Sequence, residues 1–263
     1  MSGAEGAGGD AVPELTVVVP AFNEADNIES VVGGAVSYLE SVRIDYEIAI
    51  VDDGSRDGTA ERIKELGRNN PKIDFVIHPA NRGYGAALRS GIEMSRGNRI
   101  LVSDGDGQFP ISDLGPMWER RDEADMVIGY RAPRRDLPHR RFAGWLYGRL
   151  LVRLVFGGRH RDVNCGFKLI SRRVLEGMEL VSNGALVSAE LLTRARLRGA
   201  SFVEVAVRHL PRRQGRATGL LPRVVLTMVK EMLFFRSKIL SRSPQPAAPG
   251  LRTRCDAVES PTS

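Results

Sequence analysis

The sequence has little cysteine and no uninterrupted apolar run of membrane-spanning length. Cys165 and Cys255 are its 2 cysteines, and neither has a CxxC neighbour or clustered histidines. This scarcity excludes a disulfide framework, argues against a zinc site and favours a reducing compartment. Charge interrupts the longest apolar stretches, as at Lys230 and Glu231, so none reaches the ~20 apolar residues of a transmembrane helix.

Recognisable nucleic-acid-binding motifs are also missing. The formal net charge is +6 at pH 7, and arginine concentrates in residues 131–161 and 194–242. Such an uneven charge distribution indicates an anionic partner. These segments contain no zinc finger, no RNP-like aromatic motif and no evident helix-turn-helix. We therefore expect the partner to be the phosphate groups of a small molecule or a lipid surface, and we expect no nucleic acid.

Both ends of the sequence lack the features of a targeted or folded segment. Residues 1–13 have neither the basic start nor the apolar core of a signal peptide, and we expect a disordered leader. Residues 241–263 are rich in proline, serine and alanine and are predicted to be a disordered tail. This leaves one domain over residues 14–221, followed by a helix over residues 222–240. A cytoplasmic location is expected.

The predicted helix over residues 222–240 has an apolar stripe at helical spacing with basic residues along its border. Pro222 suits its first turn. We expect this helix to lie in the membrane interface, which makes the protein peripheral on the cytoplasmic face of the membrane. The same stripe also suits packing on the domain's own core or on a second copy of the chain in a homo-oligomer.

Apolar, β-branched runs alternate with stretches of helical length and periodicity. This alternation predicts an α/β fold with a mostly parallel sheet flanked by helices. Ligands of such sheets bind beyond the carboxyl ends of the strands, where four aspartates fall. The expected strands are residues 15–20, 46–51, 74–79, 99–104, 125–130 and 202–207, and the aspartates are Asp52, Asp53, Asp104 and Asp106.

Two acidic motifs carry the chemistry that can be inferred from these residues. "VDDGS" places Asp52 and Asp53 at a strand end, where a solvated turn and a ligand-binding pair are both reasonable interpretations. "SDGDGQF" places Asp104, Asp106 and Gln108 within one loop. Hard oxygen ligands in that arrangement suit Mg²⁺ or Mn²⁺ on a phosphate, although an acidic turn without metal has the same pattern.

Five motifs together resemble family 2 glycosyltransferases. "VVVPAFNE", "VDDGSRDGT", "NRGYGAALRSG", "SDGDGQF" and "DVNCGFKLISR" occur in the order and spacing of that family. The resemblance covers about residues 15–235 and is to the branch that includes dolichyl-phosphate mannosyltransferase and dolichyl-phosphate glucosyltransferase. It implies a Rossmann-like GT-A fold, a nucleoside diphosphate sugar donor, a Mg²⁺ or Mn²⁺ cofactor and a polyprenyl phosphate acceptor.

The resemblance also implies roles for individual residues. Asp104, Asp106 and Gln108 correspond to the metal site, and Asp106 and Arg131 to catalytic positions. A loop over residues 208–219 is similar to the mobile loop that closes over the diphosphate. The implied donor-binding residues are Pro20, Phe22, Glu24, Asp52, Asp53, Gly83, Asp104, Arg131, Arg212, Arg213 and Arg216.

Several alternatives remain at this stage. Cys165 and Lys168 differ from the family's usual Ser-Gly-Phe-Arg and are closer to the glucosyl branch; we assign Cys165 a packing role. A hydroxyl acceptor would need a general base, for which Glu190 is best placed, although pairing with Arg194 is its alternative role. A non-catalytic nucleotide-binding module is a further possibility. A dinucleotide-binding protein is disfavoured, because no glycine follows the first strand and Leu88 replaces the third glycine.

Overall fold

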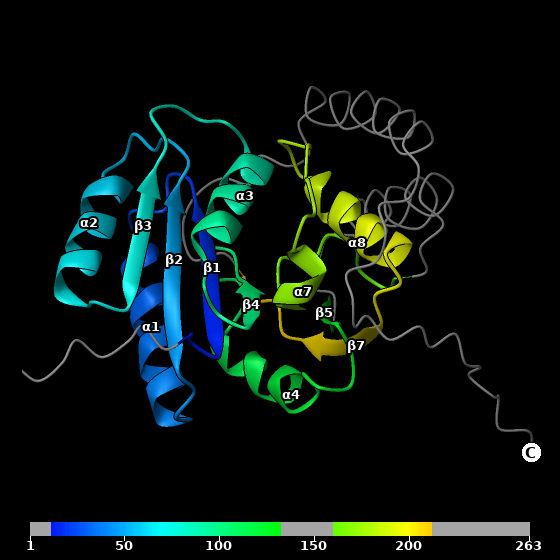
Figure 1. The fold of residues 1–263 in the computed structure, drawn as a ribbon. Helices are drawn as coiled ribbons and strands as arrows, with labels where there is room; N and C mark the ends of the chain where they lie inside the picture. Colours follow the sequence, from blue (N-terminus) through cyan, green and yellow to red (C-terminus); the bar gives the residue numbers. More distant parts are fainter. Residues whose placement is uncertain (1–11, 133–159, 212–263) are drawn as a thin grey trace, which may run out of the picture.

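The segments predicted to be strands form a seven-stranded sheet in the computed structural model, which describes residues 12–132 and 160–211 (Figure 1). The strand order is β3-β2-β1-β4-β6-β5-β7, and β6 alone runs antiparallel to its neighbours. The strands are β1 (Leu15–Ala21), β2 (Tyr46–Asp52), β3 (Ile73–Ile77), β4 (Arg99–Val102), β5 (Met126–Arg131), β6 (Lys168–Ser171) and β7 (Phe202–Val207).

Helices cover both faces of this sheet (Figure 1). They are α1 (Ile28–Ser41), α2 (Thr59–Asn69), α3 (Tyr84–Met94), the short 3-10 helix η1 (Ile111–Asp113), α4 (Leu114–Glu119), α7 (Arg172–Leu175) and α8 (Val187–Leu197). Successive side chains of a strand point to opposite faces, so β1 contributes Val17 and Val19 to one core cluster and Val18 to the other. The mostly parallel, helix-flanked sheet predicted from the sequence is therefore confirmed.

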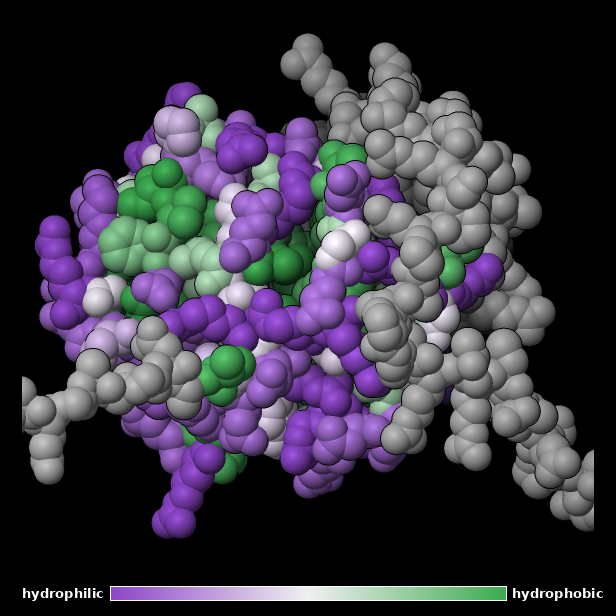
Figure 2. Space-filling view, in the orientation of Figure 1, coloured by the Kyte–Doolittle hydropathy of each residue, from purple (hydrophilic) through white to green (hydrophobic). Residues whose placement is uncertain are grey.

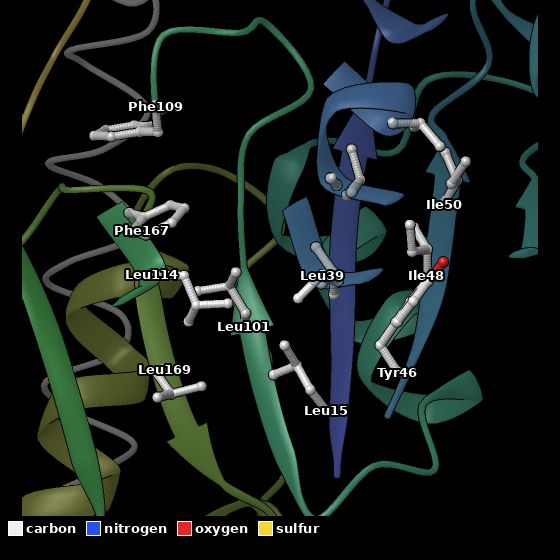
Figure 3. Packing of buried hydrophobic residues seen from close by; sticks show 14 of the residues in the cluster. Leu15, Leu39, Tyr46, Ile48, Ile50, Leu101, Phe109, Leu114, Phe167 and Leu169 are labelled. Atoms are coloured by element: carbon white, nitrogen blue, oxygen red, sulfur yellow. The ribbon is translucent and has the colours of Figure 1, made fainter. Parts of the chain in front are cut away.

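The first cluster packs beneath α1 and α4, and the second lies beneath α3 and α8. In α1, Ile28, Val32, Ala35 and Leu39 are buried at the spacing of one helix face. Figure 3 shows Leu39 beside Leu15 and Tyr46, and it shows the rings of Phe109 and Phe167 near the upper end of the cluster. Because β1 and β2 are buried along their whole length, both read as nearly continuous apolar runs.

Strand β6 was not predicted. It has only 4 residues, and the buried Lys168 interrupts its apolar pattern. At the other end of the sheet, β3 is an edge strand that exposes Phe75 and Val76, and Figure 2 shows hydrophobic side chains over this region. Among the residues that the structure describes, no helix combines the length and the apolar character required to cross a bilayer.

Several predictions concern parts of the chain that lie outside the described residues. These are most of the leader over residues 1–13, the helix over residues 222–240, the tail over residues 241–263, and the loop arginines Arg212, Arg213 and Arg216. The domain boundaries at residues 14 and 221 remain predictions.

Candidate functional site

The predicted acidic residues gather at the carboxyl ends of β2, β1 and β4, which are adjacent in the sheet. Backbone hydrogen bonds connect the residues that follow β4 and β2 to the end of β1. The Gly105 amide donates to the Pro20 carbonyl at 3.2 Å, and the Asp53 amide donates to the Ala21 carbonyl at 2.9 Å. The two acidic motifs therefore occupy one continuous edge, which we call the carboxyl edge.

Asp104 is partly exposed as a residue, but one oxygen of its carboxylate is buried. Its Oδ1 atom is buried and accepts no hydrogen bond within the described part of the chain. Burial raises the pKa of Asp104 to about 6, and repulsion from Asp106 adds to the increase. Tyr84, Lys168 and Arg131 act in the opposite direction. A buried carboxylate that needs more positive charge than its surroundings supply is suited to a cation.

Gly166 gives Asp104 the space it occupies. A Cβ atom at Gly166 would lie 2.1 Å from Asp104 Oδ2, far inside van der Waals contact. The loop that carries Gly166 therefore packs directly against the first acid of the D-x-D motif. This glycine belongs to the predicted "DVNCGFK" motif, but the sequence alone did not indicate which side chain it accommodates.

Asp106 and Gln108 lie in the same loop with defined partners. The Asp106 Oδ1 atom accepts a hydrogen bond from the backbone amide of Gln108 at 3.0 Å. The side-chain Nε2 atom of Gln108 donates to the Leu210 carbonyl at 3.1 Å. Phe109 stacks on Phe167 with ring centroids 5.7 Å apart, which anchors the end of the loop. The segment that follows β7 therefore runs beside the D-x-D loop.

The donor set at Asp104 and Asp106 fits Mg²⁺ or Mn²⁺. No cluster of three or more metal-binding side chains (His, Cys, Asp or Glu) occurs among the residues described. Mg²⁺ normally takes one or two protein carboxylates and completes its coordination with water and phosphate oxygens. Two carboxylates, one of them with an unpartnered buried oxygen, match that requirement better than they match a closed protein cage.

The two acids of "VDDGS" have different surroundings. Asp52 accepts hydrogen bonds from the Ser55 amide at 3.2 and 3.3 Å and from the Ser55 hydroxyl, and burial raises its pKa. Asp53 accepts hydrogen bonds from the backbone amides of Arg82 at 3.0 Å and Gly83 at 2.8 Å. The Asp53 carboxylate therefore holds the chain that enters α3, and its predicted contact with a nucleoside remains a prediction.

His78 was missed by the sequence reasoning. Its Nδ1 atom lies 2.7 Å from Asp53 Oδ1, its Nε2 atom lies 3.0 Å from Ser90 Oγ, and the residue is 4% exposed. This buried Asp53–His78–Ser90 chain links β2, the end of β3 and α3. A histidine at the end of the "DFVIHP" run was the one available signal, and nothing in the sequence marked its partners.

The other predicted donor residues lie in β1, just beyond β1 and at the start of α3. Pro20 lies in the buried strand β1, while Phe22 is 44% exposed just beyond that strand. Glu24 is buried and its Oε2 atom accepts a hydrogen bond from Asn27 Nδ2 at 2.7 Å. Gly83 has a φ of +97° and lies against Asn183, where a side chain has no room. Phe22 is the member of this group that offers an exposed ring at the carboxyl edge.

Arg131 is oriented by a buried acid. Its Nε and Nη2 atoms donate to the two carboxylate oxygens of Asp162 at 2.6 and 2.9 Å. Lys168 is also buried, and its Nζ atom donates to the Cys165 carbonyl. Positive charge thus lies close to Asp104 even without a metal. Cys165 is fully buried, and burial raises the pKa of its thiol to about 11, which agrees with the packing role expected for it.

Glu190 has no exposed surface and makes three hydrogen bonds. Its carboxylate accepts from the backbone amides of Val181 at 2.9 Å and Ser182 at 2.8 Å, and from Arg194 Nε at 2.8 Å. The pairing with Arg194 is the alternative role that the sequence suggested. Glu190 therefore supports the loop that packs against Gly83 and Gly85, and this geometry does not favour a general base.

Comparison with known proteins was made on sequence and on fold. The model of the family "Glycosyl transferase family 2" matches residues 16–178. The chain is 30% identical to a dolichyl-phosphate beta-glucosyltransferase of Trichomonas vaginalis, over 73% of this chain and 64% of that protein. It is 31% identical to polyprenol monophosphomannose synthase of Mycolicibacterium smegmatis, over 76% of this chain and 78% of that protein.

The fold is similar to that of glucosyl-3-phosphoglycerate synthase from Mycobacterium tuberculosis, solved with Mn²⁺, UDP and phosphoglyceric acid. The TM-score is 0.64 at 22% identity, covering 85% of this chain and 78% of that one. This likeness concerns the GT-A fold alone. The chain spans 51% to 64% of the length of three dolichyl-phosphate beta-glucosyltransferases of Trichomonas vaginalis that it matches.

Proposed function

Because this chain belongs to glycosyl transferase family 2, we propose that it is a metal-dependent, inverting glycosyltransferase. In this proposal it moves a sugar from a UDP- or GDP-linked donor to a polyprenyl phosphate. Similarity to proteins named for dolichyl-phosphate and polyprenol substrates supports the acceptor. The fold likeness to a synthase solved with UDP and Mn²⁺ supports a nucleoside diphosphate donor.

The observation that carries the proposal is the electrostatic state of the D-x-D pair. The Oδ1 atom of Asp104 is buried and accepts no hydrogen bond within the described residues, and the pKa of about 6 reflects desolvation together with the neighbouring Asp106. Asp104 and Asp106 would hold Mg²⁺ or Mn²⁺, with Gln108 beside them. When bound, the metal supplies positive charge that stabilises the departing nucleoside diphosphate.

The chain's own residues position the two substrates. Asp52 and the exposed ring of Phe22 lie where β2 and β1 end, and we assign them to the nucleoside. Arg131, held by both oxygens of Asp162, presents a fixed guanidinium near Asp104. We assign Arg131 to the phosphate groups that meet during transfer, because a cation between two anions reduces their repulsion.

A phosphate acceptor fits the surroundings of Glu190. A phosphate monoester with a second pKa near ~6 is already anionic at neutral pH and needs no general base. A hydroxyl acceptor would need one within hydrogen-bond reach. Glu190 is fully buried and its carboxylate is committed to Val181, Ser182 and Arg194, so we assign it to loop support.

The remaining parts of the proposal concern the C-terminal part of the chain. The Leu210 amide donates a hydrogen bond to the Gln108 carbonyl, and Gln108 Nε2 donates to the Leu210 carbonyl. Arg212, Arg213 and Arg216 therefore follow directly from a point beside the D-x-D loop, and we assign them to the donor diphosphate. We also propose that residues 222–240 bind the membrane interface on the cytoplasmic face, where a polyprenyl phosphate can be reached.

Transfer of a radiolabelled sugar tests this function. The purified full-length chain is incubated with UDP-glucose, UDP-galacturonate or GDP-mannose, each with a polyprenyl phosphate and Mn²⁺. We expect one donor to give a lipid-extractable product that disappears with EDTA. The matched control is the same polyprenol without its phosphate, which should accept no sugar. Equal transfer to the free alcohol, or full transfer in EDTA, would contradict the proposal.

A further inference from the structure

A pocket of about 430 Å³ opens at the opposite edge of the sheet from the D-x-D motif. Its walls come from the start of β4, the end of β6, the first residues of α7, and the residues around the end of α4. Since β6 is antiparallel, its last residue Ser171 pairs with Arg99, the first residue of β4. We call the edge of the sheet at which β4 begins the amino edge. Arg99 and Asp104 are five residues apart along the chain, which is roughly 15 Å in an extended strand.

Four arginines line this pocket: Arg99, Arg121, Arg172 and Arg173. All four are partly buried, and the Arg99 side chain is 16% exposed. The lining acids Glu14, Asp122 and Glu176 are exposed. Water screens those acids, and the Arg121 and Arg173 side chains are also 34% and 39% exposed, so a lower dielectric applies mainly at Arg99. The pocket therefore presents four guanidinium groups, with the carboxylates of its lining acids exposed to water.

Few carboxylates neutralise the arginines. Arg99 and Arg121 share Asp122, at 3.1 and 3.6 Å, and the Asp122 side chain is 76% exposed. Arg172 donates to two neutral acceptors, the Gly97 carbonyl at 2.7 Å and the Ser95 hydroxyl at 3.3 Å.

Arg173 has the strongest compensation, because it pairs with the fully buried Asp125. Asp125 also accepts hydrogen bonds from the Ser201 amide at 2.8 Å and the Ser201 hydroxyl at 2.7 Å. The four guanidinium groups thus meet one buried acid, Asp125, and three exposed lining acids.

Mutual repulsion within this wall is visible at Arg99. Burial is the main cause that lowers the pKa of Arg99, and Asp122 opposes it; the charges of Arg173 and Arg121 lower the pKa by a smaller amount. A bound anion would relieve this repulsion and replace the water lost from the guanidinium groups. Guanidinium groups are planar forks of donors that match the oxygens of phosphate, so phosphate is the anion they recognise best.

We propose that the amino-edge pocket is a binding site for the phosphate group of a small molecule, separate from the carboxyl edge. The volume of about 430 Å³ lies within the range of small-molecule sites, so the ligand extends beyond a single phosphate. Trp118 supplies a flat apolar wall, and the guanidinium of Arg121 lies over its ring at 4.8 Å. The same phosphate chemistry is offered by an anionic lipid headgroup, and the experiment separates the two sources.

Trp118 provides a local reporter of binding. The chain has 2 tryptophans, so Trp145→Phe leaves Trp118 as the only one. Fluorescence of this variant is titrated with inorganic phosphate and with pyrophosphate at constant ionic strength, with chloride as the control anion. Asp104→Asn is added to the background so that metal-assisted phosphate binding at the carboxyl edge does not contribute. We expect a saturable change with phosphate that chloride does not reproduce.

Neighbouring arginines provide the matched variants. Arg121→Gln removes a pocket guanidinium, whereas Arg120→Gln removes an exposed one that pairs with Glu123 at 2.7 Å outside the pocket lining. We expect Arg121→Gln and Arg172→Lys each to weaken phosphate binding at least tenfold, and Arg120→Gln to leave it unchanged. Thermal melting of each variant without ligand checks that the fold is intact.

A vesicle assay identifies the source of the phosphate. The same variants are floated with vesicles of phosphatidylglycerol and phosphatidylcholine, and with phosphatidylcholine alone. Saturable phosphate binding without a change in flotation assigns the site to a soluble ligand. Flotation that needs Arg121 and Arg172 assigns it to a lipid headgroup. If binding is non-saturable, or if Arg121→Gln and Arg120→Gln behave alike in both assays, the pocket is not a phosphate site. Sugar transfer is a separate readout, so failure here leaves the proposed function untouched.

Discussion

The two edges of the sheet differ in the charged groups that line them. The carboxyl edge collects Asp52, Asp53, Asp104 and Asp106 where β2 and β4 end, and the amino edge collects four arginines around the start of β4. The acids occur in two short motifs, whereas the arginines come from positions 99, 121, 172 and 173. An edge built from consecutive loop residues is visible in the sequence. An edge built from three separate segments becomes visible only when the chain is folded.

The edges also differ in how their charges are neutralised. At the carboxyl edge, backbone amides and hydroxyls solvate Asp52 and Asp53, while one oxygen of Asp104 accepts no hydrogen bond in the described ranges. At the amino edge, neutral carbonyls, the shared surface acid Asp122 and the buried acid Asp125 face the guanidinium groups. Both edges thus hold charge that a ligand of opposite sign would stabilise, and the predictions below test how separate they are.

Loss of the D-x-D acids should have the largest effect. We expect Asp104→Ala and Asp106→Ala each to weaken Mn²⁺ affinity by at least ~10²-fold and to abolish metal-dependent donor binding, because each removes one of few protein ligands. Isothermal titration with Mn²⁺ and with donor measures both. Asp122→Ala is the matched acid at the amino edge, and it should leave both affinities unchanged. Equal donor binding with and without Mn²⁺ in the wild type would contradict this prediction.

Gly166→Ala should weaken Mn²⁺ binding at the carboxyl edge without replacing either of the two metal-binding aspartates. The added methyl carbon would lie 2.1 Å from Asp104 Oδ2, so the carboxylate or its loop must move. We expect Mn²⁺ affinity to fall by about tenfold or more, which is the scale of disturbing a ligand's supporting contacts. Gly34→Ala in α1 is the control, because an added Cβ there meets nothing within 4 Å. Unchanged Mn²⁺ affinity in Gly166→Ala would show that this contact does not position Asp104.

Low pH should weaken metal binding at the carboxyl edge. The pKa of Asp104 is about 6, above its usual 3.8, so a metal must displace a proton from this carboxyl below pH 6. We expect Mn²⁺ affinity to fall by up to about tenfold between pH 6 and pH 5. Above pH 7, protonation of Asp104 should have little effect on that affinity.

The same shift predicts the opposite trend for metal-free stability. A raised folded-state pKa adds stability at low pH that is lost as the pH rises through about 6, by about 3 kcal/mol at most. Denaturant titrations of wild type and Asp104→Asn at pH 5 and 7.5 measure this. A stability difference between the two proteins that does not change with pH would contradict it.

Breaking the Asp53–His78 contact should have the smallest effect of the set. Asparagine can place its amide nitrogen near the position of His78 Nδ1, whereas glutamine places it near Nε2. Because Nδ1 is the atom that faces Asp53, we expect His78→Asn to preserve amide protection at Arg82 and Gly83 better than His78→Gln does. Hydrogen exchange of the ligand-free protein measures this directly.

Kinetics of the His78 variants show whether His78 positions the loop or only stabilises the fold. We expect His78→Gln to raise the KM for the donor a few-fold with kcat nearly unchanged, because the altered loop lies at the carboxyl edge and His78 itself is buried. Ser90→Ala removes the other partner of the ring and serves as the control. Identical exchange and kinetics in all three variants would show that the His78 contact does not position the loop.

Much of the fold could be predicted because its signals are local. The run "LTVVVP" is buried on both faces as β1, and the alternation of such runs with helical segments indicated a parallel sheet. β6 could not be predicted, since it has only 4 residues and begins with Lys168, a charged residue that is buried with its Nζ atom donating to the Cys165 carbonyl. The position of the D-x-D motif followed from its place after a strand.

The roles of individual site residues were harder to predict. Asp52 and Asp53 are adjacent in sequence, but only Asp53 faces the amides of Arg82 and Gly83. Glu190 bonds to residues 181 and 182 as well as to Arg194, and only the pair with Arg194 has a helical spacing visible in the sequence. Contacts between loops depend on the whole fold. The sequence therefore identifies the acids, but it does not show which of them accept hydrogen bonds from the protein's own loops.

The ion pair between Arg131 and Asp162 has a consequence for how this fold can vary. It joins two points of the chain that flank residues 133–159, and the Ala132 amide adds a hydrogen bond to the Val207 carbonyl at 3.0 Å. With both attachment points fixed to the sheet, the closure entropy of an intervening segment grows only slowly with its length. This position is therefore expected to tolerate insertions, because a longer intervening segment adds little to the entropic cost of closing it.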